Sequence, residues 1–145
     1  MDARTVLLVE GDRHSRLMYG AILQHYGYGV LQADDGEEGF RLACTHHPDL
    51  IVVELAVSVR DGHRLTERLK QDSRTASILV LVVTAWARAV DREVAEHDGC
   101  SGYLAKPCTP RRVLQEVRRF IGPPAGGRSD WRHGLRTRFR ERHPH

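Results

Sequence analysis

Five short apolar runs alternate with five longer segments of helical spacing, and this alternation is the feature that most constrains the fold. The runs are rich in Val, Ile and Leu and predict strands over 5–9, 28–33, 49–53, 77–84 and 102–105. The segments between and after them predict helices over 15–26, 37–47, 62–72, 89–99 and 110–122. Two consecutive parallel strands must be joined by a crossover segment, which is usually a helix. Strict alternation therefore predicts an α/β protein whose parallel sheet is covered by helices on both faces.

The ends of the predicted helices carry ordinary start and stop signals. Pro110 suits the first turn of the last helix, and Gly122 is a plausible stop for it. Gly27 and Gly99 stop two of the earlier helices in the same way, and Pro48 ends another.

The charge is unevenly divided along the chain. Of the net +3, residues 123–145 contribute +4, with six arginines against Asp130 and Glu141, so residues 1–122 carry −1. We therefore expect a folded domain over 1–122 and a basic, flexible C-terminal tail over 123–145. Trp131 and Phe139 lie among the tail arginines and would suit contact with nucleic acid, although a solubilising end is the commoner reading of such a segment.

The cysteines indicate a reducing compartment. Cys44, Cys100 and Cys108 form an odd set without CxxC spacing, which predicts free thiols of a cytoplasmic protein rather than a disulfide framework or a zinc site. The first apolar run, Val6 to Val9, is too short for a signal peptide or a membrane span.

Charged and hydroxyl side chains gather where the predicted strands end. The carboxyl ends of parallel strands meet at one edge of a sheet, where such folds bind ligands. Carboxylates, a hydroxyl and one lysine together suit a divalent cation or a phosphoryl group, although each residue alone has a plain structural role as a cap, a strand former or a solvated cation. The residues concerned are Glu10, Gly11, Asp12, Glu54, Thr84, Ala85, Lys106 and Pro107.

The sequence resembles the receiver domain of bacterial two-component response regulators. The resemblance covers residues 5–121 and rests on VLLVEGDRHSR, PDLIVVELAVSVRDG, LVVTAWA and GYLAKPCTP, in the right order and spacing. It implies a flavodoxin-like, doubly wound, five-stranded parallel sheet of strand order 2-1-3-4-5 with five helices. It also implies a cis peptide bond between Lys106 and Pro107.

The resemblance also implies roles for individual residues. In the family two acids after the first strand help to hold Mg²⁺, and an aspartate after the third strand accepts phosphate from a histidine kinase. A Thr or Ser and a Lys then contact that phosphate, and an aromatic residue on the fifth strand turns inward on activation. By position, Glu10 matches the first acid, Thr84 (followed by Ala85) the hydroxyl, Tyr103 the aromatic residue and Lys106 the lysine.

Two positions depart from the family pattern. Gly11 stands in place of the second acid, and Glu54 stands in place of the phosphoacceptor aspartate. Ser58 also replaces the usual proline after the third strand. We therefore expect no metal site, with Glu10 and Glu54 as the residual candidates for ligands. We place Glu10 and Asp12 in an acidic pocket, and we expect the main role of Asp12 to be capping the first helix.

These departures predict an atypical receiver that is not an enzyme and needs no cofactor. We expect it to act without phosphorylation, by contact with a histidine kinase or a downstream effector through segments 89–99, 102–105 and 110–122. Glu54 would pair with Lys106, and would either imitate the phosphorylated state or lock the core, with the locked state slightly favoured.

Three rival functions stay open. The first is a phosphorylatable receiver that uses Mg²⁺ and receives phosphate from a kinase. The second is a nucleic-acid-associated protein that binds through its tail. A flavin-binding flavodoxin is the least favoured, because the first loop, EGDRHSR, is acidic where a phosphate cradle would be rich in Ser, Thr and Gly.

Overall fold

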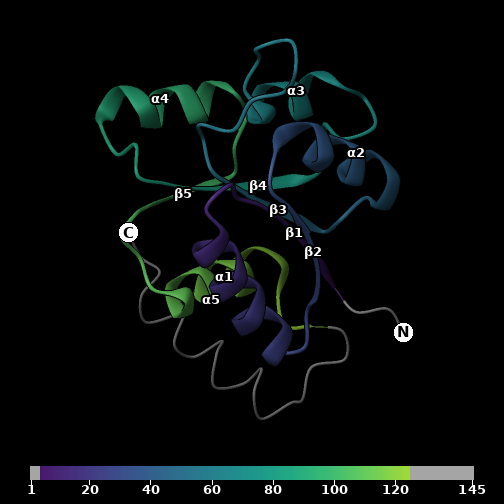
Figure 1. Ribbon diagram of the computed structural model, residues 1–145, viewed down its shortest axis with the longest axis vertical. Helices are drawn as coiled ribbons and strands as arrows, with labels where there is room; N and C mark the ends of the chain where they lie inside the picture. Colours follow the sequence, from purple (N-terminus) through teal and green to yellow (C-terminus); the bar gives the residue numbers. More distant parts are fainter. Residues whose placement is uncertain (1–3, 125–145) are drawn as a thin grey trace.

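The computed structural model describes residues 4–124 of the 145-residue chain. Strands and helices alternate along these residues, as predicted (Figure 1). The strands are β1 (Thr5–Val9), β2 (Gly29–Ala33), β3 (Leu50–Val53), β4 (Leu79–Thr84) and β5 (Gly102–Ala105). The helices are α1 (Arg13–His25), α2 (Gly36–His46), α3 (Leu65–Gln71), α4 (Ala89–His97) and α5 (Pro110–Ile121). Apart from Pro123 and Pro124, the predicted tail lies outside the described residues.

The strands form one parallel sheet in the order β2-β1-β3-β4-β5, which confirms the predicted fold. Helices α2, α3 and α4 cover one face of the sheet, and α1 and α5 cover the other (Figure 1). Strand β3 lies at the centre and is buried throughout. Its successive side chains point to opposite faces, so Leu50 and Val52 join the core under α1 and α5 while Ile51 and Val53 join the other core. No helix within residues 4–124 is long and apolar enough to cross a membrane.

The helix ends follow the sequence signals. The Asp12 carboxylate accepts a hydrogen bond from the Ser15 amide and caps α1, as predicted. Pro110 is the first residue of α5, which ends at Gly122. Gly27 follows α1 with φ of 101°, a conformation that a residue with a side chain rarely adopts.

Helix α3 is shorter than the predicted segment 62–72 and begins at Leu65. The preceding residues fold into a tight turn, in which the Leu65 amide donates to the Val57 carbonyl and Ser58 faces Arg64 in an isolated antiparallel bridge. These backbone groups are already bonded, so they are not available to extend the helix toward its N-terminus.

A nearly buried ion pair ties the start of α3 to the end of α4. Arg64 donates to both oxygens of Asp98, at 2.8 and 2.9 Å, and the Thr66 hydroxyl donates to the same carboxylate at 2.7 Å. The Asp98 side chain is 1% exposed. Burial alone would raise the pKa of this carboxyl, but the hydrogen bonds from Arg64 and Thr66 outweigh burial and hold the pKa below its usual value.

Removal of this carboxylate should destabilise the domain. We expect Asp98→Ala to lower the free energy of unfolding by about 2 kcal/mol at neutral pH, because Arg64 and Thr66 lose their common acceptor. The folded-state pKa is lowered, so the contribution is present at neutral pH and should fade as the pH falls below the usual range of an aspartate. Urea unfolding measures both effects. The exposed Glu93→Ala on α4 is the matched control, and an equal loss in the two variants would contradict the assignment.

Candidate functional site

The carboxyl ends of four strands bring four polar side chains together. Glu10 follows β1, Glu54 follows β3, Thr84 is the last residue of β4 and Lys106 follows β5. Parallel pairing places these ends at one edge of the sheet, since Val9 is opposite Val53 and Thr84 is opposite Ala105.

Lys106 is shared by the two carboxylates. Its Nζ lies 2.7 Å from Glu10 Oε1 and 3.2 Å from Glu54 Oε1. The three side chains are only 10–18% exposed, so solvent screens these interactions weakly. Burial lowers the pKa of Lys106, but the hydrogen bonds and charges of Glu10 and Glu54 outweigh it and the pKa is raised overall. The ammonium group therefore stays charged at and well above neutral pH.

The second oxygen of Glu54 is also occupied. The Thr84 hydroxyl donates a hydrogen bond to Glu54 Oε2, and the Ala56 amide lies 3.5 Å from the same oxygen. The Glu54 carboxylate thus receives a hydroxyl and an ammonium group from two different strand ends, besides a weak contact with its own loop.

A chain of hydrogen bonds continues from Glu54 into the loop after β4. The Trp86 amide donates to Thr84 Oγ1 at 3.0 Å, and the Tyr103 hydroxyl donates to the Trp86 carbonyl. The guanidinium group of Arg92, on α4, lies 5.4 Å from the centre of the Tyr103 ring. The carboxylate at the end of β3 is therefore connected to the β4–α4 loop and to β5.

Glu10 is fixed by its own loop and by α1. Its Oε2 accepts from the Asp12 amide at 2.9 Å, and its backbone carbonyl accepts from Arg16 at 2.7 Å. The Asp12 carboxylate bonds the Ser15 amide instead of Lys106. Hydrogen bonds from Ser15 are the main cause of the lowered pKa of Asp12, and the charge of Lys106 adds to them.

The remaining positions lie around this cluster. The Lys106–Pro107 peptide bond is cis, as the resemblance implied. Ala85 is exposed, and Trp86 is 48% exposed. Gly11 presents no side chain, and a Cβ built on it would meet only the Asp34 carbonyl at an ordinary 3.6 Å.

Comparison with known proteins identifies the family of this domain. The sequence pattern of the response regulator receiver domain matches residues 6–118. The chain belongs to that family.

Individual receiver proteins resemble this domain over most of their length. The polar-differentiation response regulator DivK of Brucella ovis is 29% identical over 119 residues, which cover 82% of this chain and 97% of DivK. The chemotaxis response regulator CheY4 of Vibrio cholerae is 26% identical, with a TM-score of 0.74 over 83% of this chain and all of that one.

The receiver domain of the sensor histidine kinase PA1611 from Pseudomonas aeruginosa is a third relative. It is 28% identical, with a TM-score of 0.72 over 82% of this chain and 98% of that one. In that crystal structure a magnesium ion is coordinated in the active-site cleft.

The residues of this receiver domain do not fit Mg²⁺. Magnesium requires near-octahedral oxygen ligands, including carboxylates that face the ion. Here Gly11 supplies no ligand, the Asp12 carboxylate caps α1, and the ammonium group of Lys106 lies between the two carboxylates that remain. Among residues 4–124, no group of three or more His, Cys, Asp and Glu side chains is placed to hold a metal ion.

Sequence reasoning paired Lys106 with Glu54 and missed two contacts. Glu10 is the nearer partner of Lys106, and Arg16 holds the Glu10 carbonyl. Among the residues assigned functional roles by the resemblance, Lys106 alone is cationic, so the sequence already indicated that Glu10 and Glu54 would compete for it. The Arg16 contact depends on the start of α1 and had no signal in the motif.

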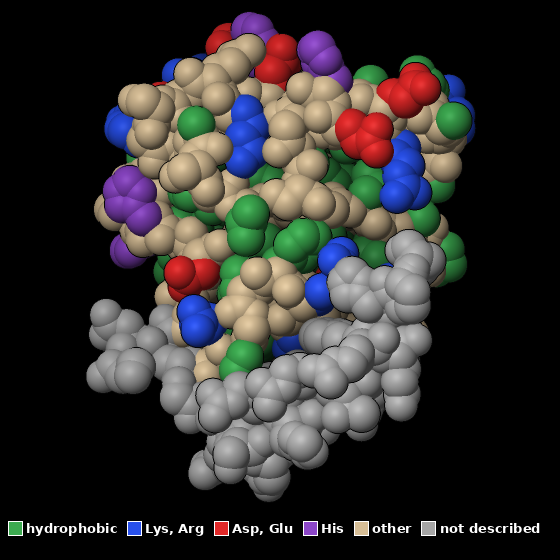
Figure 2. Space-filling model, turned by 180° about the vertical axis from the view of Figure 1, so that it is seen from behind, with side chains coloured by type: hydrophobic (Ala, Val, Ile, Leu, Met, Phe, Trp, Pro, Cys, Tyr) green, Lys and Arg blue, Asp and Glu red, His purple; other side chains and the backbone are tan. Residues whose placement is uncertain are grey.

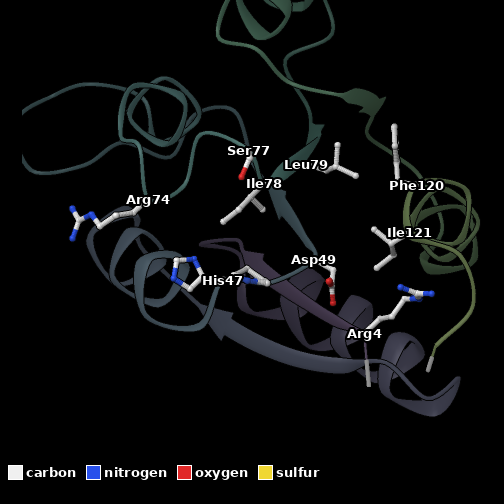
Figure 3. Close-up of a pocket in the computed structure, with 10 residues that line it drawn as sticks. Arg4, His47, Asp49, Arg74, Ser77, Ile78, Leu79, Phe120 and Ile121 are labelled. Carbon is white, nitrogen blue, oxygen red and sulfur yellow. The ribbon is translucent and has the colours of Figure 1, made fainter. Parts of the chain in front are cut away.

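A hollow elsewhere in the molecule does not compete with this site. On the side shown in Figure 2, hydrophobic side chains reach the surface in a band across the molecule. A hollow of about 550 Å³ lies at the amino ends of the strands, between Arg4, Asp49 and Leu79 among others (Figure 3). Two of its polar groups are engaged within the chain, since Arg4 donates to the Pro123 carbonyl and Asp49 accepts from the Thr5 amide.

Replacement of the shared lysine should destabilise the domain. We expect Lys106→Met to cost about 3 kcal/mol of unfolding free energy at pH 7.5, because two largely buried carboxylates lose their common cation.

Urea unfolding at pH 7.5 measures this cost. The same substitution in a Glu10→Gln background is the control and should cost less at pH 7.5, since a single carboxylate then remains. An equal cost in both backgrounds would contradict the shared-lysine arrangement.

Proposed function

We propose that this receiver domain takes part in two-component-type signalling without being phosphorylated, and acts by protein–protein contact. The observation that carries the proposal is that one carboxylate, Glu54, receives both the Thr84 hydroxyl and the Lys106 ammonium group. By the family resemblance, these are the two side chains that would contact a phosphoryl group. Glu54 thus takes the contacts that phosphorylation would otherwise create.

The same contacts disfavour phosphoryl transfer to Glu54. Such transfer depends on an in-line nucleophile and on a metal ion that neutralises the transferred group. Glutamate carries its carboxylate about 1.5 Å beyond the position of an aspartate. Both Glu54 oxygens are already bonded, and the site lacks a fitting set of metal ligands. The proposal therefore gives the domain no catalytic step and no cofactor.

Of the two outcomes expected from the sequence, this contact pattern favours the phosphate-imitating one over a merely locked core. A carboxylate carries one negative charge where a phosphoryl group carries nearly two, so the imitation is a weak one. The influence of Glu54 still extends to the surface of the domain, because the hydrogen bonds from Thr84 through Trp86 to Tyr103 connect it to the β4–α4 loop.

The partner surface in this proposal is the face formed by α4, β5 and α5. Trp86 and Val90 are 48% and 51% exposed there, at the start of α4. Large exposed apolar side chains beside a hydrogen-bonded loop suit contact with a histidine kinase or a downstream effector. The three cysteines are free thiols, which supports a cytoplasmic location for such a partnership.

The rival is a phosphorylatable receiver, and incubation with acetyl phosphate and Mg²⁺ distinguishes the two. Intact-mass analysis of the wild-type chain should show no labile phosphoryl adduct. The double variant Gly11→Asp, Glu54→Asp should gain one, since it restores the second acid and shortens the nucleophile. The open space at Gly11 accommodates the new side chain.

Two results would contradict the proposal. A labile adduct mapped to Glu54 in the wild type would establish the rival function. Failure of the folded double variant to gain an adduct would show that these two positions do not explain the loss of phosphorylation. Glu54→Asp alone is the matched control and should label less than the double variant, because Gly11 still supplies no metal ligand.

A further inference from the structure

The hollow at the amino ends of the strands lies at the opposite end of the sheet from Glu54. Residues at or just before the starts of β1, β3 and β4 line it, together with the end of α5. Its volume of about 550 Å³ lies within the range of small-molecule sites. A ligand held there would be remote from the polar side chains at the carboxyl ends of the strands.

One wall of this hollow is apolar. It is formed by Leu79, at the start of β4, with Phe120 and Ile121 at the end of α5 (Figure 3). Leu79 is 36% exposed, and the two α5 residues are partly exposed. An apolar group of a ligand that covered these side chains would remove them from water, which is favourable.

Two opposite charges lie beside the wall without pairing. Arg4 precedes β1 and Asp49 precedes β3, so they come from neighbouring strands, and both line the hollow. Arg4 Nε donates to the Pro123 carbonyl at 2.8 Å, and Asp49 Oδ2 accepts from the Thr5 amide at 2.8 Å. Within residues 4–124, the terminal nitrogens of Arg4 and the second oxygen of Asp49 make no hydrogen bond or ion pair, with each other or with another group.

The other side of the hollow is formed by His47 and Arg74 (Figure 3). Arg74 is already bonded through two nitrogens to Asp72, at 3.0 and 2.8 Å. Arg4 and Asp49 are therefore the formal charges of the lining that have no charged partner within residues 4–124.

We propose that this hollow binds a free α-amino acid with a large apolar side chain. The ligand carboxylate would face the guanidinium group of Arg4, whose planar fork suits a carboxylate, and the ammonium group would face Asp49. Neighbouring strands lie about 4.8 Å apart, so a ligand that carries both charges on one carbon can bridge these two residues. Its side chain would lie on the wall of Leu79, Phe120 and Ile121.

Ligands of other charge types fit the hollow less well. An anion without an ammonium group would face the Asp49 carboxylate, and a cation without a carboxylate would face Arg4. An uncharged apolar ligand would remove part of both charges from water without giving them a partner, which costs free energy. The zwitterion satisfies both charges as well as the apolar wall.

Titration of the full chain with L-phenylalanine and two analogues tests the proposal. Phenylpropionate lacks the ammonium group and phenethylamine lacks the carboxylate, while both keep the aromatic ring. ¹H–¹⁵N correlation spectra should show saturable shifts of the amides of 4–5, 49–50, 77–79 and 120–121 with phenylalanine, with a Kd of about 1 mM or below. Each analogue should bind at least about tenfold more weakly, because one charge of the site stays without a partner.

Two charge variants locate the ligand groups. Arg4→Gln removes the fork, and Asp49→Asn removes the charge while it keeps an oxygen that can accept from the Thr5 amide. Each should weaken binding of phenylalanine about tenfold. Asp49→Asn should also abolish the preference for phenylalanine over phenylpropionate, which a merely structural role of Asp49 would not do. The exposed Glu93→Gln on α4 is the control and should leave binding unchanged.

Several outcomes would overturn this assignment. One is the absence of saturable shifts with phenylalanine up to about 10 mM, and another is equal binding of all three compounds. Shifts confined to amides outside the hollow would place the binding elsewhere. Shifts of the hollow amides on raising the protein concentration alone, with sedimentation showing a dimer, would assign the hollow to a second copy.

Discussion

A single ammonium group holds two carboxylates together at the carboxyl ends of the sheet. Glu10 and Glu54 end neighbouring strands, so the backbone alone brings two like charges into a site that solvent barely reaches. Lys106 neutralises one charge of the two. The remaining charge is distributed over hydrogen-bond donors, which are the Thr84 hydroxyl and the Asp12 amide, with a longer contact from Ala56.

The two departures from the family pattern belong together in this arrangement. A third acid at position 11 would leave two uncompensated negative charges, which only a bound cation could offset. With Gly11 in place, one lysine and a few donors suffice. The longer side chain at Glu54 then reaches both Thr84 and Lys106, so the site is complete within the protein itself.

Much of this could be predicted from the sequence, because the decisive signals were local or fixed by topology. The alternation of apolar runs and helical segments determined the sheet, and the strand-end residues had to converge once the strands were parallel. The predicted start of α3 was wrong by several residues. Hydrogen bonds between Val57, Leu65 and their neighbours form a turn there, and the residue types do not predict this turn. The preference of Lys106 for Glu10 depends on side-chain reach across β4 and β3, which a linear pattern does not encode.

The signalling face that we propose depends on one side chain. Glu54 connects through Thr84 and Trp86 to Tyr103. In the function that we propose, a fixed charge therefore sets the β4–α4 loop in place of a reversible modification. A domain of this kind would act as a constant contact surface and not as a switch.

The most direct test is the ¹H–¹⁵N correlation spectrum of the full chain before and after addition of Mg²⁺ and beryllofluoride, a tetrahedral analogue of the phosphoryl group. The account predicts that the amides of Thr84, Trp86 and Tyr103 do not move, because Glu54 already occupies the contacts that the analogue would make. Saturable shifts of these three amides that require both Mg²⁺ and the analogue would contradict it.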